Sequence, residues 1–241
     1  PVPVVRVPCG VQGRIIHVKW DSPGPTFDGK TWDTAYHTVG TGLAAAISGD
    51  EVWVTAGIYQ ENITLPAGVR LFGSFAGNEA VRQVHRAWLT NLTILQGDNT
   101  NSVVTIASGA AENTVLDGFT IQNGLGNAST YCGGGVYCVD ASPTISHNII
   151  TANGHGFYSL GGGIYCSGGS PKILENTIMA NRAINGGGIF CSQSVPVISG
   201  NVISNHANIQ FGGGIYLDSC TAAVVTNNML TRNSVAAGGG V

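Results

Sequence analysis

The chain has 241 residues, of which 43% are hydrophobic and 10% are charged, and its formal net charge is −3. This composition is too apolar for an intrinsically disordered chain and too poor in lysine and arginine for nucleic-acid binding driven by phosphate contacts. No uninterrupted apolar run approaches membrane-spanning length, so we expect no membrane-spanning segment.

Residues 1–50 are predicted to form an N-terminal strand, loop and capping helix ahead of the repeats. The chain begins without methionine, so we expect that a targeting segment was removed or left out. Residues 2–7 form an extended apolar stretch. Residues 41–48 predict a helix that stops at Gly49, and its apolar face would cover the open end of the first coil.

The N-terminal loop holds three carboxylates within a turn-rich stretch, at Asp21, Asp28 and Asp33. Carboxylate oxygens are ligands for Ca²⁺, although this spacing is not that of an EF-hand loop. Solvated turn residues are the alternative interpretation. Apart from this candidate Ca²⁺ site, the sequence predicts no cofactor.

Residues 51–241 are predicted to form one continuous β-helix domain. Alternating runs at residues 52–54, 62–65 and 69–73 predict the three strands of a first turn. Residues 77–91 break this rhythm and predict a projecting loop, where function is often found. Three basic residues of this loop could meet an acidic polysaccharide: Arg82, His85 and Arg86.

A Gly-Gly-Gly-aliphatic-aromatic motif organises the rest of the chain. Its copies begin at Gly133, Gly161, Gly186, Gly212 and Gly238, at intervals of 28, 25, 26 and 26 residues. A period in the twenties is typical of a solenoid, in which each repeat forms one turn and stacks on its neighbours. Two further β-branched runs follow each complete copy, so we predict an all-β parallel β-helix of about seven coils, with rungs about 4.8 Å apart.

An asparagine recurs at the end of the second run of each repeat, at Asn148, Asn176, Asn201 and Asn228. Asparagine tolerates left-handed backbone at a tight corner, and its amide can bond the asparagine one rung above. We therefore predict an asparagine ladder along the axis. Ligand binding by these amides is the alternative interpretation.

Strand alternation places Cys138, Cys166 and Cys191 inside the helix, and Leu217 at the equivalent position supports this. Parallel, in-register side chains rarely offer the dihedral angle that a disulfide needs, so we predict buried free thiols. A column of thiols also does not converge on one point as zinc ligands do. The pairing state of three further cysteines stays open: Cys9, Cys132 and Cys220.

The same alternation turns four aromatic residues outward, at Tyr137, Tyr165, Phe190 and Tyr216. They should form a column at the rung spacing, which could stack on a sugar or pack laterally against another chain. The alternative is that a loop of the same chain, such as residues 154–160, covers them.

Several motifs together carry a family resemblance. They are Pro23-Gly24-Pro25, Gly29, Trp32, Gly49-Asp50-Glu51-Val52-Trp53-Val54 and Ala56-Gly57-Ile58-Tyr59. With them, residues 20–77 resemble the start of bacterial right-handed parallel β-helix repeat proteins of the pectin-lyase-like superfamily. The Gly-rich repeats are similar to surface repeats of that group and, more loosely, of chlamydial polymorphic outer-membrane proteins. The resemblance implies a secreted or bacterial cell-surface protein, but no particular activity, because this fold hosts lyases, hydrolases, adhesins and tailspikes.

The catalytic candidates are few. His147 and Glu175 occupy the same repeat position one coil apart, with Lys172 nearby, so a proton-transfer pair is conceivable. A surface ion pair is the alternative interpretation. The acids that follow Gly133 do not fall at one repeat position, so they do not predict the paired carboxylates of a glycosidase.

We therefore expect a non-catalytic, secreted or cell-surface β-helix module with a structural, adhesive or assembly role. Its partner would be a polysaccharide or neighbouring copies of itself. The alternative is a polysaccharide lyase or glycoside hydrolase, or a fragment of one. The chain stops inside a repeat at Gly238, so we expect either further coils or a head-to-tail homo-oligomer in which residues 2–7 donate a strand.

Overall fold

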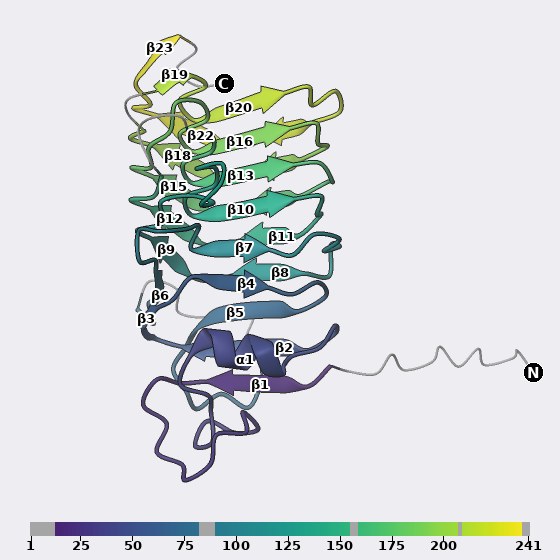
Figure 1. Cartoon of the computed structure of the whole chain (residues 1–241), viewed down its shortest axis with the longest axis vertical. Helices are drawn as coiled ribbons and strands as arrows, with labels where there is room; N and C mark the ends of the chain where they lie inside the picture. Colours follow the sequence, from purple (N-terminus) through teal and green to yellow (C-terminus); the bar gives the residue numbers. More distant parts are fainter. Residues whose placement is uncertain (1–12, 82–89, 155–158, 207–208, 238–241) are drawn as a thin grey trace, which may run out of the picture.

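The structure is a computed structural model that describes residues 13–81, 90–154, 159–206 and 209–237. Some predicted features lie outside these ranges: the strand donor at residues 2–7, Cys9, Arg82, His85, Arg86 and the last Gly-rich copy. The described residues form a parallel β-helix whose coils stack along one axis (Figure 1). The predicted all-β fold is confirmed.

Three parallel sheets run along the axis, and we name them A, B and C. Sheet A is made of β1 (Ile15–Val18), β2 (Glu51–Thr55), β5 (Arg70–Phe75), β8 (Val115–Asp117), β11 (Thr144–Ser146), β14 (Lys172–Leu174), β17 (Val197–Ser199) and β21 (Val224–Thr226). Sheet B is made of β3 (Gly57–Gln60), β6 (Thr93–Gln96), β9 (Thr120–Gln122), β12 (Ile149–Thr151), β15 (Thr177–Met179), β18 (Val202–Ser204) and β22 (Met229–Thr231). Sheet C is made of β4 (Ile63–Leu65), β7 (Val104–Ile106), β10 (Val136–Val139), β13 (Ile164–Ser167), β16 (Ile189–Ser192) and β20 (Ile215–Asp218).

The described strands of sheets A, B and C number eight, seven and six, so the coil count differs slightly from the expected seven. A short two-stranded sheet, β19 (Ile209–Phe211) with β23 (Val235–Ala237), stands apart from these three. The repeat therefore builds three flanks of different composition. Each flank presents outward side chains at the rung spacing.

The start of the stack differs from the sequence prediction. β1 pairs in parallel with β2, so sheet A begins one strand before residue 51. The first full turn consists of β2, β3 and β4, whereas residues 70–75 form β5 and begin the next coil. The sequence pattern did not predict β3 as a separate strand, because Ala56 is the single residue between β2 and β3.

Helix α1 (Val39–Ala45) begins and ends earlier than the predicted 41–48. Its start is capped by the Thr38 hydroxyl, which accepts the Thr41 N–H at 3.2 Å, and by the distant Glu61 carboxylate, which accepts the Val39 and Gly40 N–H groups at 2.7 and 2.8 Å. Val39 and Leu43 are buried, and α1 packs on β1, β2 and β4, the last strand of sheet C at this end. The helix therefore does cover the first coil (Figure 1).

The interior is a set of aliphatic columns that includes the predicted thiols. Cys138, Cys166 and Cys191 are fully buried, in register and free, with Ile106 below them and Leu217 above. Hydrogen bonding with the neighbouring thiols, together with burial, raises the pKa of Cys166 well above its usual value. The prediction of buried free thiols is confirmed. Two cysteines left open by the sequence, Cys132 and Cys220, are also free.

Candidate functional site

The corner between sheets A and B carries the predicted asparagine ladder. The side-chain amide of Asn148 donates to Asn176 at 3.1 Å, that of Asn176 to Asn201 at 3.0 Å, and that of Asn201 to Asn228 at 2.9 Å. The residue before each ladder position has a positive φ, as at His147 (53°). The ladder prediction is confirmed, and the bonds give these amides a structural role.

A second ladder, not predicted as such, occupies the corner after sheet B. It runs through Asn153, Asn181, His206 and Asn233: Asn153 donates to Asn181 Oδ1 at 3.1 Å, and the backbone N–H of Asn181 donates to His206 Nδ1 at 3.1 Å. Asn205, the asparagine that precedes His206, takes the left-handed corner instead, with φ 58°. The ladder position is therefore one residue later.

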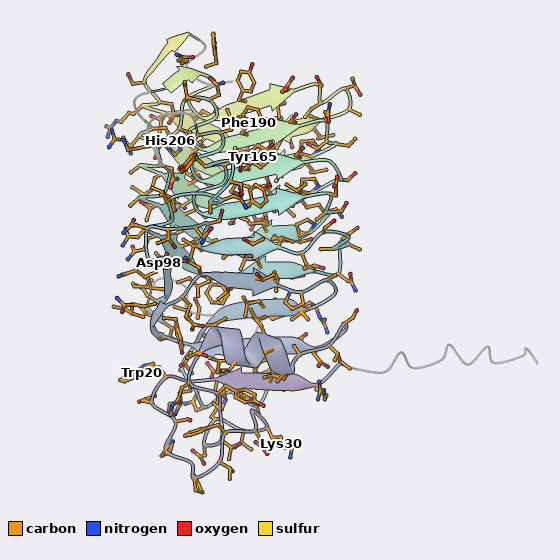
Figure 2. All side chains as sticks on the ribbon, viewed as in Figure 1. Trp20, Lys30, Asp98, Tyr165, Phe190 and His206 are labelled. Carbon is orange, nitrogen blue, oxygen red and sulfur yellow. The ribbon has the colours of Figure 1, made fainter. Side chains whose placement is uncertain are left out.

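His206 is the exception in this ladder (Figure 2). Its side chain is fully buried, and its Nε2 atom has no hydrogen-bond partner among the described residues. Burial lowers the pKa of His206 to about 4, so the ring is neutral at physiological pH. A Cβ at Gly188 would lie 2.9 Å from Nε2, and one at Gly163 would lie 3.0 Å from the amide of Asn181. The third glycine of the repeat thus leaves room for the ladder side chain.

The predicted His147–Glu175 pair forms, and it is part of a longer row. His147 Nε2 lies 2.9 Å from Glu175 Oε2, and His147 Nδ1 lies 2.7 Å from Asp117 Oδ2, which also accepts the Ser146 hydroxyl at 2.7 Å. Asp117 is 7% exposed, so the row joins a buried carboxylate to a solvent-facing one through the imidazole. Sequence reasoning missed Asp117 because it lies before the Gly-rich repeats; its register with Ser146 was the available signal.

Lys172 does not join this row. Its ammonium group pairs with Glu112, which lies in the segment between β7 and β8. The expected three-residue group of His147, Lys172 and Glu175 is therefore divided between the His147 row and a separate Lys172–Glu112 ion pair. A surface pairing role accounts for Lys172.

The candidate Ca²⁺ carboxylates do not come together. Asp28 accepts from the Thr34 hydroxyl at 2.7 Å and pairs with Lys30 at 2.9 Å, and these contacts, the Thr34 hydrogen bond first, lower the pKa of Asp28 to about 2. Asp21 lies 3.8 Å from Lys19, and the Asp33 carbonyl accepts a backbone N–H. Within the described ranges, no three acidic, histidine or cysteine side chains are close enough to share an ion.

The aromatic residues of sheet C form the predicted column, of which Figure 2 labels Tyr165 and Phe190. Ring centroids of Tyr137, Tyr165, Phe190 and Tyr216 follow one another at 5.6, 5.5 and 5.2 Å, with interplanar angles of 9°, 13° and 13°. The rings stack on one another, so the faces of the inner rings are not free for a sugar. Phe190 is only 4% exposed. Ligand binding by this column stays a prediction.

Backbone of the same chain runs beside the aromatic column. Parallel bridges join Leu160 to Asn185 and Asn185 to Phe211, and the Phe211 ring lies 6.4 Å from that of Tyr216. These bridges connect the segments that precede three Gly-rich strands. They support the interpretation in which residues of this chain shield the column.

Sheet A carries a cleft of about 280 Å³ near its N-terminal end. Ile15, Glu51, Trp53 and Arg70 contribute to its lining. Glu51 accepts from the Trp53 indole at 2.7 Å and pairs with Arg70 at 3.0 Å, so the polar groups of this cleft are already engaged with one another.

The outward side chains of sheet B form a surface that we call the B face. Its first column is Ile58, Ile94, Thr120, Ile149, Thr177, Val202 and Met229, and its second is Gln60, Gln96, Gln122, Thr151, Met179, Ser204 and Thr231. None of these side chains is charged. Gln122 donates to Gln96 at 3.1 Å, so amides also pair along the second column. This face carries no repeated motif in the sequence, unlike sheet C with its glycine and aromatic motif.

Residues 81–241 match a family model described as "Right handed beta helix region". Neither the curated proteins nor the solved structures contain a match to the chain. In the part of the chain that the structure describes, no helix has the length and apolar character needed to cross a membrane.

Proposed function

Because the chain belongs to the right-handed β-helix family, we propose that it is a secreted or cell-surface module with an adhesive role that binds an uncharged polysaccharide. The observation that carries this proposal is the distribution of charge over the three flanks. Outward positions of sheet B hold no charged side chain, and those of sheet C hold one, Asp218. Four outward positions of sheet A are charged: Glu51, Arg70, Asp117 and Lys172.

An uncharged flank suits a neutral ligand for a physical reason. Hydroxyl and amide groups can exchange water for sugar hydroxyls without the large cost of desolvating an ion. An acidic polysaccharide needs unpaired cations instead. The outward cations of sheet A, Arg70 and Lys172, are already paired with Glu51 and Glu112.

The alternative of a glycosidase receives less support from the geometry. Such enzymes place two carboxylates on either side of the scissile bond, with the sugar between them. In the Asp117–His147–Glu175 row, the imidazole fills the space between the carboxylates. The row is therefore a relay of hydrogen bonds and leaves no room between its acids for a substrate.

Retention of the wild-type protein on insoluble neutral and acidic polysaccharides, at low and high salt, tests the proposal. We expect retention on a neutral polymer that persists at high salt, because screening weakens only charged contacts. Retention on acidic polymers alone, lost as salt is raised, would contradict it. The same samples are assayed for new reducing or unsaturated ends, and their release would favour the lyase or hydrolase alternative.

A further inference from the structure

The B face combines neutral hydrogen-bonding groups with apolar groups that are exposed toward its two ends and half-buried between them. Ile58, Val202 and Met229 are 61%, 37% and 62% exposed, although they lie on regular strands. Single exposed apolar side chains are ordinary, but here they share one column with Thr120 and Thr177. The face therefore offers apolar and hydroxyl contacts at successive rungs.

The flank of sheet C is less suited to the same task. Its aromatic rings stack on one another at 5.2–5.6 Å, and Phe190 is buried. A sugar would reach ring edges there instead of ring faces, and CH–π contact needs the faces. In the part of the chain that the structure describes, the strands of sheet B pair with the strands above and below them, and their outward side chains are exposed or half-buried, apart from the buried Ser204.

The dimensions of the B face indicate what kind of partner it fits. Seven rungs about 4.8 Å apart give a length of about 30 Å, and outward residues two apart on a strand give a width of about 7 Å between columns. With side-chain width this is a strip of roughly 300 Å², whereas a stable protein interface needs about 800 Å² from each partner. A second folded copy would gain too little here, but a linear polymer matches the strip.

We propose that the B face is the docking surface for a neutral polysaccharide strand that lies along the axis of the β-helix. This inference rests on the proposed function and adds the surface, the direction and the length of the site. Each rung makes a weak contact, and the contacts of one polymer strand act together. Affinity should therefore rise with oligosaccharide length and stop rising once the oligosaccharide spans all seven rungs, about 30 Å.

A charge placed near the middle of the strip, on the fifth of its seven rungs, tests the location. Thr177→Lys introduces an ammonium group that a bound neutral strand would have to desolvate. Ser192→Lys is the matched control, because it adds the same charge at an outward position of sheet C, in the coil that follows Thr177. Thermal melting of both variants confirms that they fold. Thr177→Val keeps the shape of the side chain and removes only the hydroxyl group.

We expect Thr177→Lys to weaken retention on the neutral polysaccharide at least tenfold, Thr177→Val to weaken it a few-fold, and Ser192→Lys to leave it unchanged. If the wild type is retained and Ser192→Lys weakens retention as much as Thr177→Lys does, this inference is overturned and the proposed function still stands. Failure of the wild type to bind any neutral polysaccharide would instead remove the proposed function. Concentration-dependent dimers that Thr177→Lys abolishes would identify a second copy as the occupant and overturn the inference as well.

Discussion

Replacing His206 with asparagine should stabilise the protein and remove a pH-dependent loss of stability. Asparagine occupies the equivalent ladder position in the two coils before His206, at Asn153 and Asn181, and in the coil after it, at Asn233. The amides of Asn153 and Asn181 donate to carbonyl groups in the coil below, at 2.9 and 2.8 Å. An amide at position 206 should make the same kind of bond to the Ile178 carbonyl, whereas the Nε2 atom of His206 has no hydrogen bond of normal geometry among the described residues.

The expected magnitude has two parts. A hydrogen bond of normal geometry at this buried position, where the described residues give His206 Nε2 none, should raise the free energy of unfolding by about 1–2 kcal/mol at neutral pH. The second part is proton linkage, because burial lowers the pKa of His206 to about 4, below the usual histidine value of about 6.5. As pH falls from about 6.5 to about 4, His206 takes up a proton in the unfolded chain but stays largely neutral in the folded protein. This difference lowers the free energy of unfolding by about 3 kcal/mol.

Urea unfolding followed by circular dichroism at several pH values between neutral and about 4 measures both parts. The wild type should lose about 3 kcal/mol more than His206→Asn over this range, because only the wild type carries the buried imidazole. His37→Asn, which removes an exposed histidine, is the control. Parallel pH profiles for the wild type and His206→Asn would show that the ring is not held neutral in the folded state.

Two further predictions concern the interior and the aromatic column. The thiols of Cys138, Cys166 and Cys191 should resist modification in the native protein and react once denaturant is added, because they are fully buried and free; rapid modification of all three without denaturant would contradict their inward orientation. Phe190→Ala should lower the stability by about 3 kcal/mol or more, since it empties a buried site between two stacked rings, and Tyr137→Ala at the end of the column should cost less. Equal costs, measured by urea unfolding, would show that the stack does not couple the rings.

The sequence by itself determined the repeating part of the architecture. The glycine motif sets the period, and strand alternation then decides which side chains face inward, as with Cys166, or outward, as with Tyr165. Ladder residues such as Asn176 could be identified because stacked coils bring equivalent positions within one rung of each other. These features depend on adjacent residues or on the repeat period, and both can be read from the amino-acid sequence.

Only the tertiary structure decided the contacts between residues at non-equivalent positions of the repeat. His147 bonds Asp117, which lies in a coil without the glycine motif. The first turn of the helix bonds Glu61. Lys172 pairs with Glu112, which lies in a loop. Contacts of this kind depend on how the chain returns after loops of unequal length, which the repeat does not specify. The corner register decides which residue joins the second ladder, because the left-handed residue precedes the ladder position in each coil and so places His206 in the core after Asn205.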